Sequence, residues 1–267
     1  MFKSSKLSVF LLFSMLLILA ACGNGEESSA ESDDQADETS SATVTISAAA
    51  SLTDAIQEVG ELFNEENPDI QLDFNFGGSG ALQQQISQGA PADIFFSASQ
   101  SDFDTLVDEG AIDQENSSQL LKNELVLVVP EDKTRVTSFD NLTSAENIAV
   151  GTPESVPAGE YAMETFDSMN LTQDLEDKLI YAEDVRAVLT YVERGEVDAG
   201  LVYRTDAMTS DKIEIVDAAK EDTHTPIEYP VGLINDSENQ EAAQAFYEFL
   251  QTEEALKVFE DYGFVTE

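Results

Sequence analysis

The sequence of 267 residues predicts an α/β protein of two lobes, each with a central β-sheet flanked by helices. Short runs rich in branched and aromatic residues alternate with helical patterns, which is typical of βαβ units and a parallel sheet. The alternation starts again at "ELVLVVP", residues 124–130, and a late strand, "IEYPVGLI" at 227–234, falls outside that second series. Such a strand indicates that the C-terminus returns to complete the first lobe. We expect lobe 1 at residues 43–121 plus 230–267 and lobe 2 at 122–229.

Residues 1–21 have the composition of a signal peptide. Lys3 and Lys6 precede an apolar run of 15 residues, Leu7–Ala21, which leads directly into Cys22. The run is shorter than the roughly 20 residues needed to span a bilayer, and small residues stand where a peptidase would cut. A buried core helix is the less favoured alternative. We therefore expect a lipobox, with Cys22 as the lipidated residue that anchors the protein to the outer face of the cell membrane.

Residues 22–42 are expected to form a disordered acidic tether. Residues 23–41 contain seven acidic residues, no basic residue and no aromatic or branched aliphatic residue. Such a segment cannot bury enough apolar surface to offset the entropy lost on ordering. Cys22 is the only cysteine, which excludes a disulfide framework and a cysteine-based metal site.

The chain is strongly acidic, with 54 acidic and 12 basic residues and a formal net charge of −42. Removing the signal peptide would also remove two of the lysines. A surface of this charge repels nucleic acid and anionic lipid headgroups at long range. The net field cannot attract an anion either, so an anion site would need a local source of attraction.

The individual elements follow in chain order. In the first series, three strands each precede a helix: "TVTISA" before residues 52–64, "IQLDFNF" before 81–88 and "DIFFSA" before 101–109. In the second series, "NIAVG" precedes residues 159–169, "KLIYA" precedes 184–194 and "AGLVY" precedes a further helix. Two amphipathic helices are expected after the late strand, with apolar faces that include Phe246 and Phe259.

Ligands of open α/β sheets bind at the carboxyl ends of the strands, so the turns from strand to helix are the candidate site. In "AAASLTDA", Ser51 stands three positions before Asp54, which is the spacing of a capping box. An ordinary helix cap is therefore the alternative to a ligand-binding serine.

The turn "FNFGGSGALQQQ" carries a hydroxyl among glycines at a helix start. Its glycines would let the backbone approach a ligand, and Ser79 supplies both a hydroxyl and an N–H group. The turn is not a P-loop, because no Gly-Lys-Ser/Thr follows. It is not a hydrolase elbow of the G-x-S-x-G type, because Ala81 occupies the last position.

Two later turns and one strand end complete the set. Pro157 suits the first position of a helix and leaves the amide of Ala158 uncovered by a bulky side chain. Asp184 can cap later amides and leave the N–H of Val185 free. Tyr203 ends a buried strand, where its hydroxyl needs a partner; a core tyrosine bonded to backbone is the alternative.

Taken in order, five stretches resemble the molybdate-binding proteins of bacterial ABC importers: "AAASLTDA", "FGGSGALQQQISQGAPADIFFSA", "VGTPESVPAGEYA", "AEDVRAVLTYVERGEVDAGLVYRTDA" and "QAFYEFLQTEEALKVFEDYGF". The resemblance covers residues 43–267. It implies a type II solute-binding fold that closes over a tetrahedral oxyanion in the cleft between its lobes, with no charged contact.

The resemblance also implies roles for individual residues. Molybdate would be bound by hydroxyl and backbone donors of Ser51, Ser79, Ala158, Val185 and Tyr203. Arg204 could face the cleft or solvent, and solvent is favoured. The implied protein is a monomeric extracytoplasmic lipoprotein that delivers molybdate to an ABC permease, with no cofactor and no metal other than the molybdenum of its ligand.

Two other classes of function are less favoured by the sequence. An enzyme is disfavoured because His224 is the only histidine and no nucleophile–base pair or paired-carboxylate motif accompanies it. A tungstate-preferring or sulfate-type binding protein of the same fold remains the alternative, since tungstate has nearly the same size and charge as molybdate.

Overall fold

A computed structural model describes residues 42–132 and 135–266 of the chain. The predicted signal peptide, Cys22 and all of the predicted tether except Ala42 lie outside these residues. Among the described helices, none combines the length and the apolar character needed to cross a membrane.

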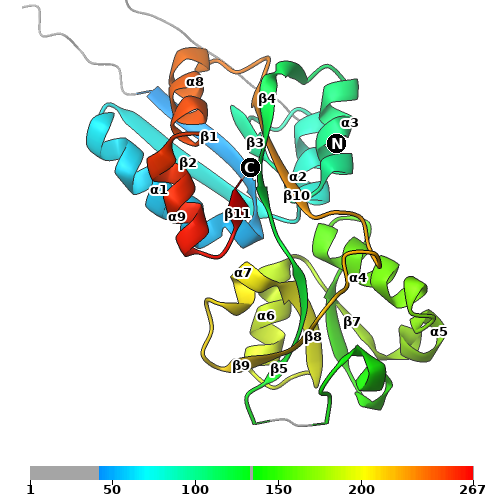
Figure 1. Cartoon of the computed structure of the whole chain (residues 1–267). Helices are drawn as coiled ribbons and strands as arrows, with labels where there is room; N and C mark the ends of the chain where they lie inside the picture. Colours follow the sequence, from blue (N-terminus) through cyan, green and yellow to red (C-terminus); the bar gives the residue numbers. More distant parts are fainter. Residues whose placement is uncertain (1–41, 133–134, 267) are drawn as a thin grey trace, which may run out of the picture. The chain divides into compact units, whose positions relative to one another are not determined.

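The first sheet has six strands in the order β11-β4-β10-β3-β1-β2 (Figure 1). β1 pairs in parallel with β2 and β3, whereas β10 runs antiparallel to β3 and β4. The strands are β1 (Ala42–Ala49), β2 (Ile70–Gly77), β3 (Ile94–Phe96), β4 (Ile112–Lys122), β10 (Glu228–Ile234) and β11 (Val265–Thr266). The helices of this first lobe are η1 (Ala50–Leu52), α1 (Thr53–Glu66), α2 (Ser79–Ser87), α3 (Gln100–Asp108), α8 (Gln240–Phe249) and α9 (Glu253–Asp261).

The second sheet has five strands in the order β7-β6-β8-β5-β9. β6 is parallel to β7 and β8, whereas β5 is antiparallel to β8 and β9. The strands are β5 (Leu125–Pro130), β6 (Ile148–Gly151), β7 (Leu179–Ala182), β8 (Ala199–Tyr203) and β9 (Ile213–Ala218). The helices of this second lobe are η2 (Phe139–Ser144), α4 (Pro157–Ser168), α5 (Thr172–Leu175), η3 (Glu176–Lys178), α6 (Val185–Glu193) and α7 (Arg204–Ala207). Two mixed sheets flanked by helices confirm the predicted fold class.

Two crossings connect the sheets, one between β4 and β5 and one between β9 and β10. They lie side by side: the N–H of Asn123 donates to the carbonyl of Ile227 at 3.2 Å, and Lys122 stands opposite Glu228 in the antiparallel ladder of β4 and β10. The sequence pattern placed the lobe boundaries at residues 121 and 230. In the structure β4 ends at Lys122 and β10 begins at Glu228, so both strands extend slightly beyond these boundaries.

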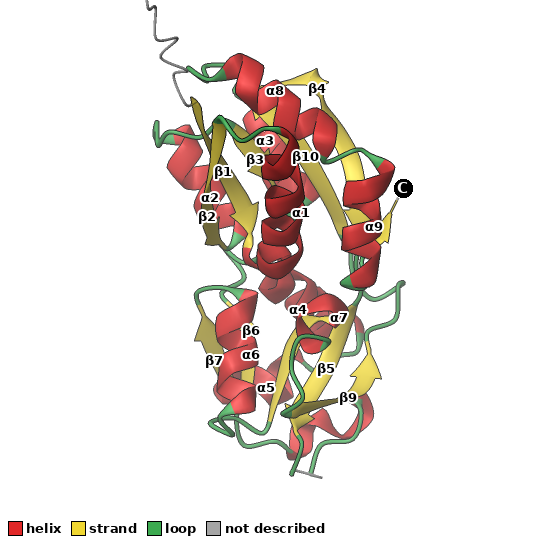
Figure 2. Ribbon diagram, turned by 90° about the vertical axis from the view of Figure 1, so that its left-hand side faces the viewer, coloured by secondary structure: helices red, strands yellow, loops and turns green. Residues whose placement is uncertain are grey.

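Alternate side chains of β3 pack on opposite faces of the first sheet. Ile94 and Phe96 belong to the main core, where the ring of Phe96 meets Phe259 of α9 edge-on at 6.0 Å. Phe95 points to the other face and stacks on Phe103 of α3, also at 6.0 Å. Figure 2 shows α1, α8 and α9 among the helices of the first lobe. Because successive side chains of a strand point to opposite faces, the three residues of β3 contribute to packing on both faces of the sheet.

Close packing of α4 on β6 sets the position of the α4 N-terminus. A Cβ atom on Gly159 would lie only 2.1 Å from the carbonyl oxygen of Gly151, so no larger residue fits without a backbone shift. The start of α4 is thereby held directly beside the carboxyl end of β6.

Gly159→Ala is expected to lower the free energy of unfolding by about 1–3 kcal/mol, because overpacking against backbone cannot be relieved by a side-chain rotation. Thermal unfolding followed by circular dichroism measures this loss. Gly77→Ala is the matched control, since its Cβ would meet Leu82 at an ordinary 3.5 Å. Equal melting temperatures for Gly159→Ala and the wild type would contradict the packing argument.

Candidate ligand-binding site

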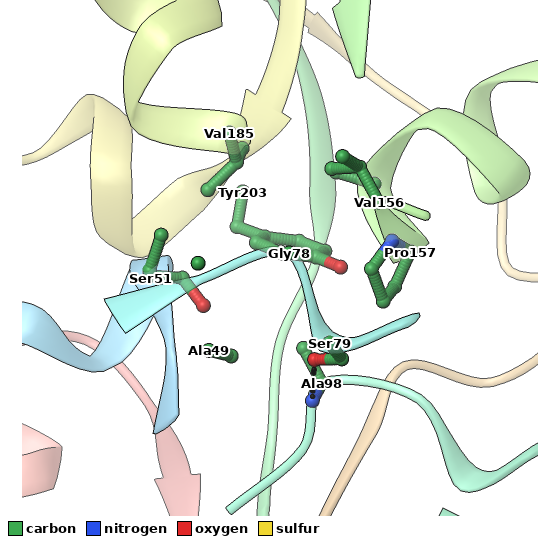
Figure 3. Close-up of a pocket in the computed structure, with 12 residues that line it drawn as sticks. Ala49, Ser51, Gly78, Ser79, Ala98, Val156, Pro157, Val185 and Tyr203 are labelled. Atoms are coloured by element: carbon green, nitrogen blue, oxygen red, sulfur yellow. Dashed lines mark hydrogen bonds between the residues drawn. The ribbon is translucent and has the colours of Figure 1, made fainter. Parts of the chain in front are cut away.

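A small cavity lies where turns from strand to helix of both lobes meet (Figure 3). Only about 10 Å³ of it is open to the centre of a water-sized sphere, far less than the roughly 300–1,000 Å³ of pockets for drug-sized ligands. Its lining consists of Ala49, Ala50, Ser51, Gly77, Gly78, Ser79, Ala98, Val156, Pro157, Ala158, Val185 and Tyr203. All five residues that the sequence predicted as a site are thus brought together in the lining of one small cavity.

Four helical N-termini converge on this cavity. Ser51 lies in the 3₁₀ turn that leads into α1, and Ser79 is the first residue of α2. Ala158 is the second residue of α4, and Val185 is the first residue of α6. The first N–H groups of a helix have no partner within it, and its N-terminus carries roughly half a positive charge. The cavity is therefore favourable to an anion without a cationic side chain in its lining.

The hydroxyl of Ser79 is arranged as a donor toward the cavity. The backbone N–H of Ala98 donates to Ser79 Oγ at 2.9 Å, and the serine is fully buried. A backbone amide can only donate, so Ser79 Oγ accepts here and keeps its own hydrogen for another partner. Figure 3 shows this bond beside the side chains of Ser51, Val185 and Tyr203.

Ser51 does not cap α1, so the alternative that its spacing from Asp54 suggested, an ordinary helix cap, is wrong. The N-cap of α1 is Leu52, and it makes no side-chain capping bond. Ser51 Oγ instead lies 2.9 Å from Tyr229 Oη on β10. The contact joins residues 178 positions apart, so local sequence spacing could not reveal it.

The starts of α4 and α6 match their predicted chemistry. Pro157 has no N–H, so the first amide of α4 belongs to Ala158. Asp184 is the N-cap of α6, and its Oδ1 accepts from the N–H of Ala187 at 2.8 Å. The N–H of Val185, at the first helical position, takes no part in that capping bond.

Tyr203 supplies an unsatisfied donor. Its side chain is 1% exposed, and its Oη has no hydrogen-bond partner among the described residues. Burial raises the pKa of Tyr203 well above its ordinary value, with the neighbouring Tyr229 adding to the effect. The hydroxyl therefore stays protonated, and a buried donor of this kind indicates a missing acceptor.

The glycine turn allows the second lobe to approach closely. A Cβ atom on Gly78 would lie 2.4 Å from the carbonyl oxygen of Ser155, and the N–H of Ala81 donates to that oxygen at 3.3 Å. Tyr161 Oη of α4 donates to the carbonyl of Ala98 at 3.1 Å. Gly78 is thus required for contact between the lobes, in addition to the predicted approach to a ligand.

An ionic contact also joins the lobes, and the sequence analysis did not identify it. Arg186 of α6 bonds Asp54 of α1, and its Nε lies 2.7 Å from Oδ1 of the fully buried Asp206. Burial raises the pKa of Asp206 to about 7, and the positive charge of Arg186 opposes that rise. Arg204 pairs with Glu124 at the surface and does not line the cavity.

The lining offers donors but no acidic or basic side chain other than the protonated Tyr203. Within residues 42–132 and 135–266, no group of three or more His, Cys, Asp or Glu side chains could hold a metal ion. His224 lies outside the cavity, with Nδ1 2.7 Å from the carbonyl of Thr225. The arrangement suits capture of an anion and supplies no general base.

Residues 44–265 match the family model described as bacterial extracellular solute-binding protein. The chain belongs to the bacterial extracellular solute-binding proteins. This membership confirms that it is not an enzyme, and it indicates an extracytoplasmic location.

Several solute-binding proteins are similar along most of this chain. A Bacillus subtilis protein, provisionally named an ABC transporter substrate-binding lipoprotein, is 48% identical and matches 100% of both chains. The Escherichia coli molybdate-binding protein ModA is 39% identical, over 83% of this chain and 88% of its own. A solved Clostridium difficile structure, provisionally described as the substrate-binding domain of a molybdenum ABC transporter, is 43% identical. Its TM-score is 0.65, and it covers 84% of this chain and 98% of its own.

In the ligand-free solute-binding protein, Tyr203→Phe should leave the free energy of unfolding unchanged or raise it by up to about 1 kcal/mol, since the hydroxyl makes no hydrogen bond to the residues that the structure describes. Tyr161→Phe is the matched control and should lower it by about 0.5–1.5 kcal/mol, because it removes the bond to Ala98. Urea unfolding measures both changes. A clear loss of stability in Tyr203→Phe would mean that its hydroxyl has a protein partner.

Proposed function

We propose that this protein captures molybdate outside the cytoplasm and delivers it to the permease of an ABC importer. The observation that carries the proposal is the convergence of neutral donors on one small cavity, including a buried Tyr203 hydroxyl that has no partner in the described part of the chain. The names of the Escherichia coli relative and of the Clostridium difficile structure support molybdenum as the element transported.

Neutral donors are sufficient to bind a dianion in such a site. Hydrogen bonds to a charged acceptor are roughly twice as strong as those between neutral groups, and they strengthen where the local dielectric is low. The donors proposed to bind the ion are the hydroxyls of Ser51, Ser79 and Tyr203 and the backbone N–H groups of Ala158 and Val185. The acidic surface then affects the rate of encounter more than the bound state.

The same donors would hold the lobes together around the ion. We assign residues 43–121 plus 230–267 to one lobe and 122–229 to the other, which agrees with the membership of the two sheets except at the strand ends Lys122, Glu228 and Tyr229. Ser51 and Ser79 then belong to the first lobe and the other three donors to the second. One small ion in contact with both groups favours the closed arrangement, as in other hinged binding proteins.

Size provides the means of selection among tetrahedral dianions. Sulfate has the charge of molybdate but is smaller, so in a closed cavity several donors would remain too far from its oxygens. Each buried donor left imperfectly paired costs about 1–3 kcal/mol. Tungstate is nearly the same size as molybdate and should bind similarly. Phosphate keeps a proton that needs an acceptor, and a ring of groups oriented as donors is poorly suited to supply one.

Titration calorimetry with sodium molybdate, tungstate, sulfate and phosphate tests the proposal. We expect molybdate and tungstate to bind within about tenfold of each other, and sulfate at least about a thousandfold more weakly. Ser79→Ala should lose about 1.5–3 kcal/mol of molybdate binding, the range for a bond to a charged group. Ser47→Ala is the matched control, because Ser47 is equally buried but does not line the cavity. Absence of binding for all four ions would refute the function, and sulfate binding as tight as molybdate would assign the protein to the sulfate type.

We also propose that the protein is a monomer anchored through lipidated Cys22. The name of the Bacillus subtilis relative, which matches this chain along its full length, supports a lipoprotein. Stable anchoring usually requires two acyl chains, which diacylglyceryl modification of a cysteine supplies. Cys22→Ala should release the protein to the medium or leave it uncleaved, as seen by fractionation and mass spectrometry. A processed variant that stays in the membrane fraction would contradict the anchor.

A further inference from the structure

We propose that Asn123 and Tyr229 are positioning residues that fix the direction of the Ser51 hydroxyl, so that its hydrogen points into the cavity and toward a bound anion. The inference rests on the proposed function, and neither residue belongs to the cavity lining. Both lie at the crossings between the lobes. Asn123 stands between β4 and β5, and Tyr229 is the second residue of β10.

The orientation of the Asn123 amide is fixed by a backbone group. The N–H of Glu124 donates to Asn123 Oδ1 at 2.9 Å. Because that backbone N–H can only donate, the oxygen of the amide must face it, and the nitrogen must face the other way. Asn123 Nδ2 then has two hydrogens, which it donates to Thr205 Oγ1 at 2.8 Å and to Tyr229 Oη at 3.2 Å.

The bond from Asn123 determines the direction in which the Tyr229 hydroxyl donates. Tyr229 is fully buried, and the hydrogen bonds of the described residues give its Oη two partners, Asn123 and Ser51. Since Asn123 only donates to it, Ser51 Oγ, 2.9 Å away, is the remaining acceptor for the tyrosine hydrogen. Burial also raises the pKa of Tyr229 well above its ordinary value, so the hydroxyl retains that hydrogen.

Ser51 therefore accepts on the side of Tyr229 and has its own hydrogen left to donate. The serine is 3% exposed and lines the cavity, so the acceptor for that hydrogen must lie within the site. The reverse arrangement, with Ser51 donating to Tyr229, would leave the tyrosine hydrogen buried without an acceptor and turn serine lone pairs toward an anion. Ser79 is oriented in the same way, because its oxygen accepts from the amide of Ala98 and its hydrogen is left to donate. Both serines of the first lobe are thus oriented as donors.

Asn123→Asp tests the direction of this relay. The carboxylate would accept the hydrogen of Tyr229, so the tyrosine oxygen would accept from Ser51 and the serine would turn its lone pairs toward the anion. We expect the affinity for molybdate to fall by about 10- to 100-fold, the equivalent of one bond to a charged group. Asn75→Asp is the charge control, because Asn75 is exposed on β2 and lies outside the cavity lining. It should change the affinity by less than about twofold.

A double-mutant cycle with Ser51→Ala separates positioning from general damage. If Asn123 acts through the serine hydrogen, Asn123→Asp should weaken binding by less than about threefold in the Ser51→Ala background. An equal loss in both backgrounds would overturn the relay. Tyr229→Phe, which keeps the ring, gives the same comparison if Asn123→Asp does not fold. Tyr247→Phe is its control, since the Tyr247 hydroxyl bonds Ser118 away from the cavity.

Calorimetry of the wild type distinguishes the two proposals. Wild-type protein that binds neither molybdate, tungstate nor sulfate refutes the proposed function, and the relay is then refuted with it as a device for anion binding. Wild-type protein that binds molybdate while the losses in the cycle simply add refutes the relay alone. Binding together with a loss that disappears in the Ser51→Ala background supports both.

Discussion

An anion removed from water must be met by hydrogen-bond donors, and this requirement accounts for much of the architecture of the protein. Donors that are not cationic come from the N-termini of helices and from hydroxyl groups. The parallel strands β1, β2, β6 and β7 each end at a turn that starts a helix, and two such turns from each sheet line the same cavity. The two sheets thus act as rigid supports that aim helix N-termini at one point.

A hydroxyl needs a further partner to fix its hydrogen-bond direction, because unlike an amide N–H it can either donate or accept. A backbone N–H has a fixed direction once its helix is in place. A serine is held as a donor when another group donates to its oxygen. The amide of Ala98 does so for Ser79, and in the proposed relay the hydroxyl of Tyr229 does so for Ser51. The residues behind the cavity therefore determine the chemistry that the cavity presents.

The sequence was sufficient for the parts of the fold and site that depend on local pattern. Alternating strand and helix patterns predicted most strands of both sheets, and the turns and strand ends between them contained the five predicted site residues, all of which line the cavity. Tyr203 could be selected because a hydroxyl at the end of a buried strand needs a partner.

Features that depend on long-range contacts could not be predicted in this way. The strand β4, "IDQENSSQLLK", shows no apolar alternation because much of it is exposed, and its strand conformation comes from pairing with β10. Ser51 has the spacing of a helix cap, yet its partner lies 178 residues away. The contact of Arg186 with Asp54 and the approach of Ser155 to Gly78 likewise join segments that are distant in the sequence.

The lack of ionisable groups in the cavity lining, apart from a tyrosine that stays protonated, has a consequence for unloading. No change of pH in the ordinary range can neutralise these donors, so titration of the cavity lining itself does not expel the ion. It can leave only when the lobes separate and water reaches the donors. The apparent affinity is then the intrinsic affinity multiplied by the fraction of molecules able to close. Work done on the hinge, for instance by a partner that binds the open form better, would release the ion without any contact with it.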